Sequence, residues 1–183
     1  MDITKLEEKK IASSEKFRGK ILKLSVDTVS LPNGEEATRE VVWHPGAVCV
    51  VPLTDEGEVV CVRQYRYPFS RVTLEIPAGK LDDPTEDPRA AALRELSEET
   101  GAECESLEFI GEIHTSPAIL YERIHMYLAR GLKFFDQHTD DDEFLSIERI
   151  PIEKLVDMII SGEIKDAKTQ AAVLKVYLME AEK

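Results

Sequence analysis

Residues 86–101, EDPRAAALRELSEETG, place Glu95, Glu98 and Glu99 within about one turn of a predicted helix. Glutamates three and four positions apart are neighbours on a helix, and each such pair repels by roughly 0.2–0.5 kcal/mol. A chain that folds into this helix must therefore offset the repulsion with another interaction. The identity of that interaction is the main question that the sequence raises.

The flanking residues predict where the helix begins and ends. Pro88 lies near its first turn and Gly101 just past its end, which are the positions that proline and glycine favour. Leu93, Leu96 and Thr100 follow the i, i+3, i+7 spacing, so we expect them to form the buried face. The glutamates then lie on another face of the helix.

Two interactions could compensate for the crowded glutamates. Arg94 precedes Glu98 by four positions, so one ion pair can orient a glutamate without neutralising the group. Hard divalent cations such as Mg²⁺ and Mn²⁺ are commonly held by a few carboxylates together with waters and substrate phosphates. Taken alone, the triplet is better explained by a solvated acidic face, so the rest of the sequence must decide.

The composition predicts one sizeable domain, or one domain with a small appendage. The chain has 183 residues, of which 43% are hydrophobic and 32% charged, and this is enough for a core without disulfides. A net charge of -13 disfavours a nucleic-acid partner, because such binding depends on Lys and Arg neutralising phosphates. A small phosphorylated ligand can still bind if divalent cations lie between carboxylate and phosphate.

The sequence also predicts a cytoplasmic protein without a membrane partner. No stretch approaches the ~20 apolar residues of a membrane span, and residues 1–16 lack the apolar core of a signal peptide. Cys49, Cys61 and Cys104 share no metal-type spacing, so we expect buried free thiols.

Alternating apolar and polar residues predict two β-hairpins. The first covers residues 17–43 around a turn at 32–34, and the second joins AVCVVPL to EVVCVRQY through a turn at 54–57. The Val-rich runs of the second hairpin predict burial on both faces. The most plausible boundary between parts of the chain falls at 44–46.

The remaining pattern predicts three more strands and two more helices. VTLEIPAGK is a short strand before the glutamate helix, and LEFIGEIHT and ERIHMYLAR are two strands after it. Two segments with apolar residues at helical spacing end the chain. Their predicted buried residues are Ile152, Leu155, Val156 and Ile159 in the first, and Ala167, Ala171, Leu174 and Leu178 in the second.

The pattern around the glutamate helix resembles the signature of the Nudix hydrolases. Glu86 is followed after seven residues by RELSEETGA at 94–102, and Gly79 matches the opening glycine of the signature. Six residues rather than the usual five separate Gly79 from Glu86, and the extra one falls in the loop before the helix. The resemblance implies an α/β fold with a mixed β-sheet sandwiched between helices. It also implies an N-terminal antiparallel β unit (1–43) that serves dimerisation and a catalytic domain (44–183).

The resemblance further implies a site for Mg²⁺ or Mn²⁺ on the helix. Glu95 and Glu99 look like the principal ligands, with Glu98 as a third or bridging one. The backbone carbonyl of Ala78 is implied to be a further ligand.

Other implied catalytic residues lie outside this ligand set. Glu86 would support Arg94 or the metal shell. In the similar enzymes the general base and one more ligand come from a loop after the helix, which here is Asp140-Asp141-Asp142-Glu143. We favour Glu143 as the ligand and Asp141 as the base, and a shift of one residue would reassign both.

Most of the chain, from about residue 17 to 178, is similar to the ADP-ribose pyrophosphatase branch of this family. The similarity is carried by SLPNGEEATREVVWHPGAVCVVPL, VRQYRYPFSRVTLEIPAGKL and HTSPAILYERIHMYLA. Pro117, sixteen residues past Gly101, matches the proline that marks ADP-ribose hydrolases, although Ala118 stands where the family usually has glycine. A turn between strands is the alternative explanation for Pro117.

The same similarity implies the residues that bind substrate. Arg66 resembles the family arginine that contacts the phosphates or ribose, with a surface ion pair as the alternative. Glu75 matches a position near the adenosine end. Trp43, Tyr65 and Tyr67 are candidates to stack on adenine, with core packing as the alternative.

The implied activity is metal-dependent hydrolysis of the diphosphate of ADP-ribose to AMP and ribose 5-phosphate. The implied assembly is a homodimer whose N-terminal β unit exchanges between subunits. Hydrolysis of another nucleoside diphosphate sugar or of a dinucleotide is one alternative, and a non-catalytic nucleotide-sensing module is another. The intact glutamate pairs argue against a sensor, because a pure binder has no need of a repulsive cluster.

Overall fold

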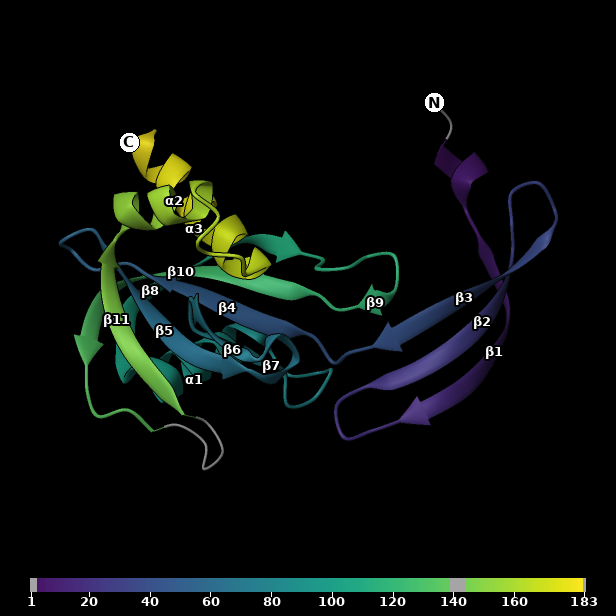
Figure 1. Cartoon of the computed structure of the whole chain (residues 1–183), viewed down its shortest axis with the longest axis horizontal. Helices are drawn as coiled ribbons and strands as arrows, with labels where there is room; N and C mark the ends of the chain where they lie inside the picture. Colours follow the sequence, from purple (N-terminus) through teal and green to yellow (C-terminus); the bar gives the residue numbers. More distant parts are fainter. Residues whose placement is uncertain (1–2, 139–143, 183) are drawn as a thin grey trace. The chain divides into compact units, whose positions relative to one another are not determined.

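A computed structural model describes residues 3–138 and 144–182, and the chain divides into two compact units (Figure 1). The first unit spans Met1–Gly46 and His114–Glu122, and the second spans Ala47–Ile113 and Arg123–Lys183. The elements of the first are η1 (Ile3–Leu6), β1 (Lys9–Arg18), β2 (Lys23–Ser30), β3 (Glu36–Trp43) and β9 (Leu120–Tyr121). The strands of the second are β4 (Ala47–Pro52), β5 (Glu58–Arg66), β6 (Arg71–Glu75), β7 (Ala78–Lys80), β8 (Ala102–Ile113), β10 (Ile124–Phe134) and β11 (Leu145–Pro151). Its helices are η2 (Tyr67–Phe69), α1 (Pro88–Thr100), α2 (Ile152–Ile160) and α3 (Ala167–Ala181). No helix in this described part is long and apolar enough to cross a membrane.

The first unit is one sheet in the order β1-β2-β3-β9. The predicted first hairpin is formed by β2 and β3 around Gly34, whose φ is +87°. The pattern missed β1, whose ten side chains are all exposed. Among residues 5–46 and 114–122, Val29 is the one hydrophobic side chain that is buried. This unit therefore has almost no apolar core of its own.

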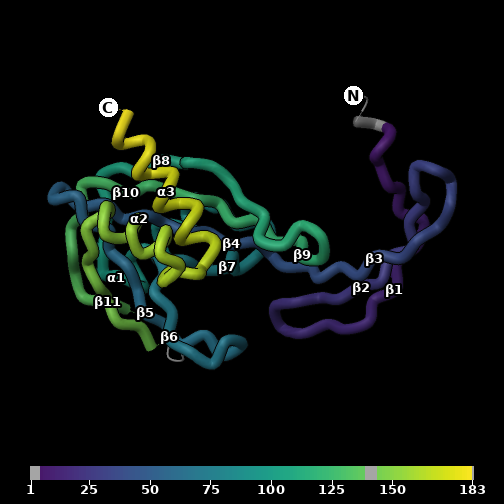
Figure 2. Tube along the Cα trace, turned by 45° about the horizontal axis from the view of Figure 1, so that its top comes forward, coloured from purple at the N-terminus to yellow at the C-terminus, as the bar shows by residue number. Residues whose placement is uncertain are grey.

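The second unit contains a mixed sheet in the order β7-β4-β10-β8 and a smaller sheet in the order β11-β5-β6. β4 and β10 run parallel, and their neighbours are antiparallel. Helix α1 covers one face of the mixed sheet, and α2 and α3 lie on the other side (Figures 1 and 2). The predicted fold class is confirmed by this arrangement.

Strand β4 shows how the mixed sheet is buried on both faces. Val48 and Val50 pack with Leu96 of α1, whereas Cys49 and Val51 face the core that α2 and α3 share with the smaller sheet. Successive side chains of a strand point to opposite faces, so a Val-rich run suits a strand between two cores. The predicted burial on both faces is confirmed.

The predicted hairpin between β4 and β5 is wrong. The turn forms, with Gly57 at φ +80° and its N–H donating to the Thr54 carbonyl at 3.1 Å. Next to the turn, the two strands share one isolated bridge, between Leu53 and Val59. Beyond it, β4 and β5 belong to different sheets. Because both strands are buried, each needs hydrogen-bonded neighbours on its two edges, and β4 finds β7 and β10 while β5 finds β6 and β11.

Helix α1 has the predicted ends but a rotated buried face. It begins after Asp87, whose side chain accepts a hydrogen bond from the N–H of Arg89, and ends at Gly101 with φ +64°. Leu93 is 40% exposed, so its predicted burial is wrong. The buried residues of α1 are Ala91, Ala92, Glu95, Leu96, Glu99 and Thr100.

The two C-terminal helices are present, and one of them is turned from its predicted orientation. Helix α2 buries Ile152, Leu155 and Ile159, as predicted. Helix α3 instead leaves its predicted core residue Leu178 exposed. Its predicted residues Ala167, Ala171 and Leu174 are exposed or half-buried. Its buried residues are Lys168, Thr169, Ala172, Val173 and Val176. Polar contacts of its first turn with β6, described below, fix this orientation.

The buried face of α1 can be tested by truncation. Leu96→Ala should lower the free energy of unfolding by about 2–5 kcal/mol, because it leaves a cavity between α1 and β4. Leu93→Ala on the same helix is the matched control and should cost less than about 1 kcal/mol. Chemical denaturation measures both values. Equal losses would contradict the assigned face.

Candidate active site

Two of the three clustered glutamates are buried. Glu95 is 7% exposed and Glu99 is 2% exposed, while Glu98 is half-buried. A solvated acidic face would leave all three in water, so that explanation is wrong for Glu95 and Glu99. Burying two like charges on adjacent turns is costly unless nearby groups compensate them.

The backbone at Ala78 and Gly79 receives both buried carboxylates. The N–H of Ala78 donates to Oε2 of Glu99 at 2.9 Å. The Glu95 carboxylate lies directly against Gly79, where a Cβ atom would overlap it. Glycine at this position therefore provides room for a charged group rather than a special backbone angle.

A break between β6 and β7 brings this backbone to the helix. The predicted single strand VTLEIPAGK is two strands, one ending at Glu75 in the smaller sheet and one starting at Ala78 in the mixed sheet. Pro77 lies between them, lacks an N–H for a ladder, and accepts a hydrogen bond from Val50 N–H at 2.9 Å. The chain thus changes sheets directly before the residues that contact α1.

Arg94 compensates part of the negative charge. Its Nη1 donates to Glu95 Oε1 at 2.8 Å and to Glu98 Oε2 at 3.1 Å, and its Nη2 lies 3.4 Å from Glu86 Oε1. Burial opposes the charge of Arg94, but Glu95 and the other carboxylates outweigh burial and raise its pKa above the ordinary value. The predicted Arg94–Glu98 ion pair is present, and Glu86 supports Arg94.

The loop before α1, which contains the extra residue, forms a hydrogen-bonded turn at residues 82–86. The N–H of Glu86 donates to the Asp83 carbonyl at 2.9 Å, and the N–H of Thr85 donates to Asp83 Oδ1 at 2.7 Å. The N–H of Asp82 donates to Glu86 Oε2 at 2.7 Å. The longer loop therefore still delivers the Glu86 carboxylate to Arg94.

A second charged cluster surrounds Glu75, which is 2% exposed at the end of β6. Arg66 donates to both of its carboxylate oxygens, from Nε at 2.8 Å and from Nη2 at 2.6 Å. Lys168 of α3 contacts Oε2, and the Thr73 hydroxyl donates to Oε1 at 2.6 Å. Burial raises the pKa of Glu75, but the hydrogen bonds and charges of Arg66 and Lys168 outweigh it and lower the pKa to about 2. The ion pair considered for Arg66 exists, and its partner is a buried carboxylate.

Lys168 has no counterpart among the residues singled out from the sequence. It is 9% exposed, and its Nζ lies 3.1 Å from Asp166 as well as against Glu75. Burial lowers the pKa of Lys168, and Asp166 and Glu75 outweigh that effect and raise it. The contact with Glu75 spans 93 positions of sequence, so no local pattern marks it.

The two clusters are neighbours in the fold. Glu75 and Ala78 flank the break between β6 and β7, and the N–H of Ile76 in that break donates to Thr169 Oγ1 at 3.0 Å. Hydrogen bonding to Glu75 has the largest effect on the pKa of Arg66, which is raised, and the charge of Glu99 acts in the same direction. The Arg66 guanidinium therefore lies within electrostatic reach of the α1 carboxylates.

The remaining predicted site residues lie in three parts of the chain: the second unit, the first unit, and residues 139–143, which the structure does not describe. Tyr65 is 56% exposed on β5 of the second unit. Trp43 and Pro117 belong to the first unit. Trp43 packs against Tyr121, with ring centroids 5.1 Å apart, and the Nζ atoms of Lys23 and Lys10 lie 4.9 and 5.8 Å from its ring centroid. Its Nε1 donates to the Ser25 hydroxyl at 2.9 Å. Asp141 and Glu143 lie outside the described residues.

The chain that leads to residues 139–143 is fastened to the end of α1. The side-chain amide of Gln137 donates to the Glu99 carbonyl at 2.6 Å. The backbone N–H of His138 donates to the Glu98 carbonyl at 3.3 Å. The last described residue before the acidic run thus lies beside the glutamate cluster.

The oxygen donors at this site fit a hard divalent cation. Glu95 and Glu99 present buried carboxylates beside the Ala78 backbone, and carboxylate and carbonyl oxygens are the ligands that Mg²⁺ and Mn²⁺ prefer. Within 3–138 and 144–182, no three His, Cys, Asp or Glu side chains are grouped as a metal centre, and Glu98 is turned toward Arg94. Among the described residues, the donors that could hold such an ion are therefore two carboxylates beside a backbone carbonyl, and further ligands would be needed.

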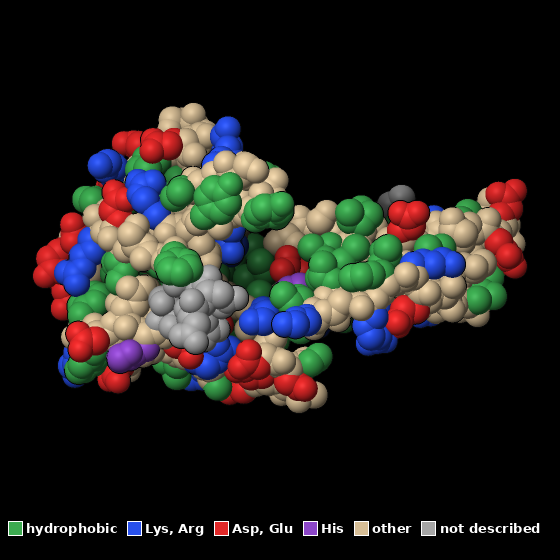
Figure 3. All heavy atoms as spheres, turned by 60° about the horizontal axis from the view of Figure 1, so that its bottom comes forward, with side chains coloured by type: hydrophobic (Ala, Val, Ile, Leu, Met, Phe, Trp, Pro, Cys, Tyr) green, Lys and Arg blue, Asp and Glu red, His purple; other side chains and the backbone are tan. Residues whose placement is uncertain are grey.

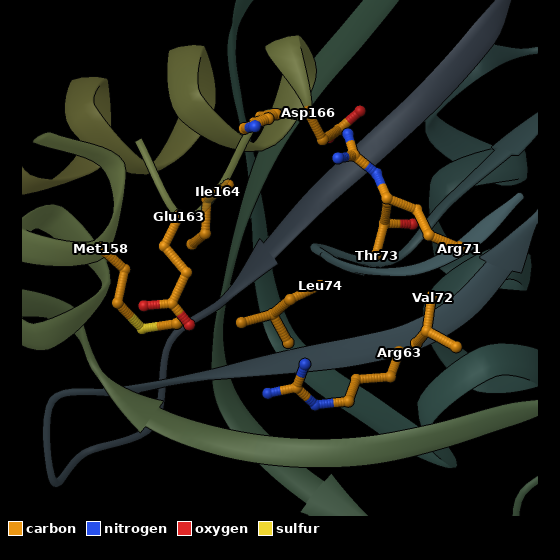
Figure 4. A pocket seen from close by; sticks show the side chains of 10 residues that line it. Arg63, Arg71, Val72, Thr73, Leu74, Met158, Glu163, Ile164 and Asp166 are labelled. Carbon is orange, nitrogen blue, oxygen red and sulfur yellow. The ribbon is translucent and has the colours of Figure 1, made fainter. Parts of the chain in front are cut away.

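A cavity of about 170 Å³ lies beside the Glu75 cluster, between the β5–β6 strands and the connection from α2 to α3 (Figure 4). Thr73 and Asp166 belong to its lining, and none of the α1 glutamates does. The charged residues of the lining are Arg63, Arg71, Glu163, Lys165 and Asp166. Its mixed charges and its position separate it from the carboxylate site.

Two family models and several known proteins are similar to this chain. Residues 43–173 match the model of the NUDIX domain, and residues 8–42 match that of the nucleoside diphosphate sugar hydrolase N-terminal domain. The chain is 45% identical to methanol dehydrogenase activator of Bacillus methanolicus, covering 96% of this chain and 95% of that protein. It is 43% identical to ADP-ribose pyrophosphatase of Bacillus subtilis, covering 96% of each. It is 35% identical to ADP-ribose pyrophosphatase of Mycobacterium tuberculosis, covering 91% of this chain and 82% of that protein.

The fold is likewise shared with a solved structure described as an ADP compounds hydrolase. The TM-score is 0.82 at 22% identity, covering 95% of both chains. The chain belongs to the Nudix family, and the resemblance stated from its motif is confirmed. Members of this family generally need divalent metal ions, which agrees with the oxygen donors on α1.

Protonation of Glu75 should destabilise the protein. Its pKa is about 2 in the folded state against an ordinary 4.5, so its contribution is complete above pH 4.5 and is lost as the pH falls toward 2. At 1.36 kcal/mol per pKa unit the loss is about 3 kcal/mol. Urea denaturation across this pH range should show the loss in the wild type and in the surface control Glu103→Gln, and much less of it in Glu75→Gln. The same pH dependence in Glu75→Gln would refute the account.

Proposed function

We propose that the protein hydrolyses the diphosphate bond of ADP-ribose to AMP and ribose 5-phosphate, in a reaction that depends on Mg²⁺ or Mn²⁺. The observation that carries the proposal is the burial of Glu95 and Glu99 against the backbone of Ala78 and Gly79. Two relatives named ADP-ribose pyrophosphatase, at 43% and 35% identity over most of the chain, support the substrate.

In this proposal the divalent ions are held by Glu95, Glu99 and the Ala78 carbonyl, with Glu98 as a third or bridging ligand. Bound there, they would neutralise charge on the diphosphate and orient or activate the attacking water. Arg94 fixes the position of Glu95 and Glu98 through its two hydrogen bonds. Burial keeps the carboxylates in place between turnovers.

Glu143 is proposed as the added metal ligand and Asp141 as the general base, although both lie outside the described residues. Support comes from Gln137 and His138, which tie the preceding chain to the carbonyls of Glu99 and Glu98. A base must lie within hydrogen-bond reach of the water that it activates. The described residues that precede Asp141 end beside the α1 glutamates, which supports this assignment.

Arg66 is proposed to bind the diphosphate or the ribose, and Glu75 to hold Arg66 in place. The bidentate contact between them supports this, because it orients a guanidinium that is still partly exposed. Tyr65 is exposed and so available to stack on adenine. Trp43 and Pro117, in the first unit, are further proposed substrate contacts.

We also propose a homodimer, with residues 1–43 as the dimerisation unit and 44–183 as the catalytic domain. The first unit has almost no apolar core, and hydrophobic side chains gather on its surface in Figure 3. The exposed hydrophobic residues of this unit include Leu6, Ile11, Phe17, Ile21 and Leu22. On the second unit, the exposed apolar residues around η2 are Tyr65, Tyr67, Phe69 and Val72. A second copy that exchanges its β unit would cover such surfaces.

A cytoplasmic location is proposed on the basis of the cysteines. Cys49, Cys61 and Cys104 are all free, and Cys49 and Cys61 are buried. Free thiols are typical of reducing compartments.

One relative favours a second candidate function. The protein at 45% identity is named methanol dehydrogenase activator, and we propose activation of a dehydrogenase as the second candidate role for this chain. Adding the purified protein and Mg²⁺ to a methanol dehydrogenase and measuring the rate of methanol oxidation tests this role. An unchanged rate would remove the candidate.

Loss of one α1 carboxylate should lower turnover by orders of magnitude and preserve the fold. Glu99→Gln keeps an oxygen that can accept from Ala78 N–H but removes the charge, so kcat on ADP-ribose should fall at least about 100-fold. Glu103→Gln, an exposed glutamate on β8, is the matched control and should stay near wild type. Melting temperatures report on folding. Near-normal activity of Glu99→Gln would refute the ligand assignment.

A panel of substrates tests the choice of ADP-ribose. The value of kcat/KM should be higher for ADP-ribose than for GDP-mannose or NADH. If GDP-mannose or NADH were cleaved much faster, that compound and not ADP-ribose would be the preferred substrate. Tight binding of nucleotides without cleavage would favour a sensor instead.

The dimer can be tested by light scattering on a sizing column. The wild type should elute with twice the mass of the chain. Phe17→Glu places a charge in the exposed apolar group of β1 and should shift the protein toward monomer. Lys16→Glu, the neighbouring exposed position, is the control and should remain dimeric. A monomeric wild type would refute the dimer.

A further inference from the structure

Lys168 joins the last helix to the proposed substrate-binding cluster. It stands in the first turn of α3, is 9% exposed, and contacts Glu75 and Asp166. A lysine is rarely buried to this extent without paired charges. Its stem could have remained in solvent if α3 had kept the orientation predicted from its apolar residues.

The cluster leaves part of Arg66 available to a ligand. Nε and Nη2 of Arg66 are both used by Glu75, and the arginine side chain is 37% exposed. Within the described ranges, Nη1 donates to no other group. The carboxylate thus fixes one edge of the guanidinium and leaves a donor on the other.

Charge counting shows what Lys168 contributes. Arg66 and Lys168 carry two positive charges, and Glu75 and Asp166 carry two negative charges, so the group is neutral as it stands. Without Lys168 it would carry a net negative charge beside the arginine. That negative charge would repel a diphosphate. Glu75 would also lose one of the two cations with which it is paired.

We propose that Lys168 is a positioning residue that sets the affinity for the substrate diphosphate, by sharing Glu75 with Arg66 and balancing the charge of the cluster. This inference rests on the proposed function. Lys168 acts through Arg66 and Glu75 and does not touch the reacting atoms. Its effect should therefore fall on binding and leave the chemical step nearly unchanged.

Steady-state kinetics on ADP-ribose can separate these effects. Lys168→Met keeps the apolar stem and removes the charge, and KM should rise about tenfold while kcat changes less than about threefold. Lys165→Met, an exposed lysine three positions earlier, is the matched control and should leave both values unchanged. Lys168→Arg keeps the charge and should restore most of the affinity. A large fall in kcat with unchanged KM, or no difference between Lys168→Met and Lys165→Met, would overturn the proposal.

A second variant tests the same balance in the opposite direction. Asp166→Asn keeps a good helix N-cap for α3 and removes one negative charge from the cluster, so KM should fall several-fold. This variant decides the matter if Lys168→Met does not fold. A raised or unchanged KM for a folded Asp166→Asn would contradict the charge-balance account.

A binding measurement separates this inference from the proposed function. The probe is an ADP-ribose analogue with a methylene group in place of the bridging oxygen, titrated calorimetrically with Mg²⁺ present. Tenfold weaker binding to Lys168→Met supports the inference whether or not ADP-ribose is cleaved. Equal binding to both proteins contradicts it, and absence of binding to the wild type contradicts both. A wild type that binds the analogue and does not cleave ADP-ribose refutes only the proposed function.

Discussion

The close approach of two buried carboxylates to one stretch of backbone is the constraint on which the second unit depends. Glu95 and Glu99 reach Ala78 and Gly79 only because residue 79 has no side chain and because the chain changes sheets at Pro77. Arg94 balances part of the charge through its hydrogen bonds to Glu95 and Glu98. Tertiary contacts thus offset a repulsion between carboxylates that would weaken an isolated helix. Such an arrangement is expected where charged groups serve a function.

The features of this unit that could be predicted from sequence are those that local physics decides. The ends of α1 follow from Pro88 and Gly101, and the Arg94–Glu98 pair follows from helical spacing. The alternating runs correctly placed most strands. The pairing of β4 with β10 rather than with β5 could not be predicted, because a strand buried on both faces carries no sign of its neighbours. Leu93 was misassigned because Glu95 and Glu99 share the buried face with Ala91, Ala92 and Leu96, and Leu93 lies outside that face.

In the candidate site, too, local sequence patterns could be predicted and contacts between distant residues could not. The carboxylates and the glycine form a motif with fixed spacing, so they could be found without a structure. Arg66 and Glu75 were found separately, and their bidentate contact emerged only from the fold. Lys168 could not be found, because its partner lies 93 positions away and the apolar pattern of α3 favours another face. A buried ion network therefore links the C-terminal helix to the residues proposed to bind substrate, and it orients that helix.

The buried carboxylates of α1 are proposed to form a site for a divalent ion. The most direct test is the anomalous diffraction of a crystal grown with Mn²⁺. We expect a manganese ion bound by carboxylate oxygens of both Glu95 and Glu99 on the side of Ala78. Manganese that is bound elsewhere, with both carboxylates left to their protein partners at saturating Mn²⁺, would contradict it.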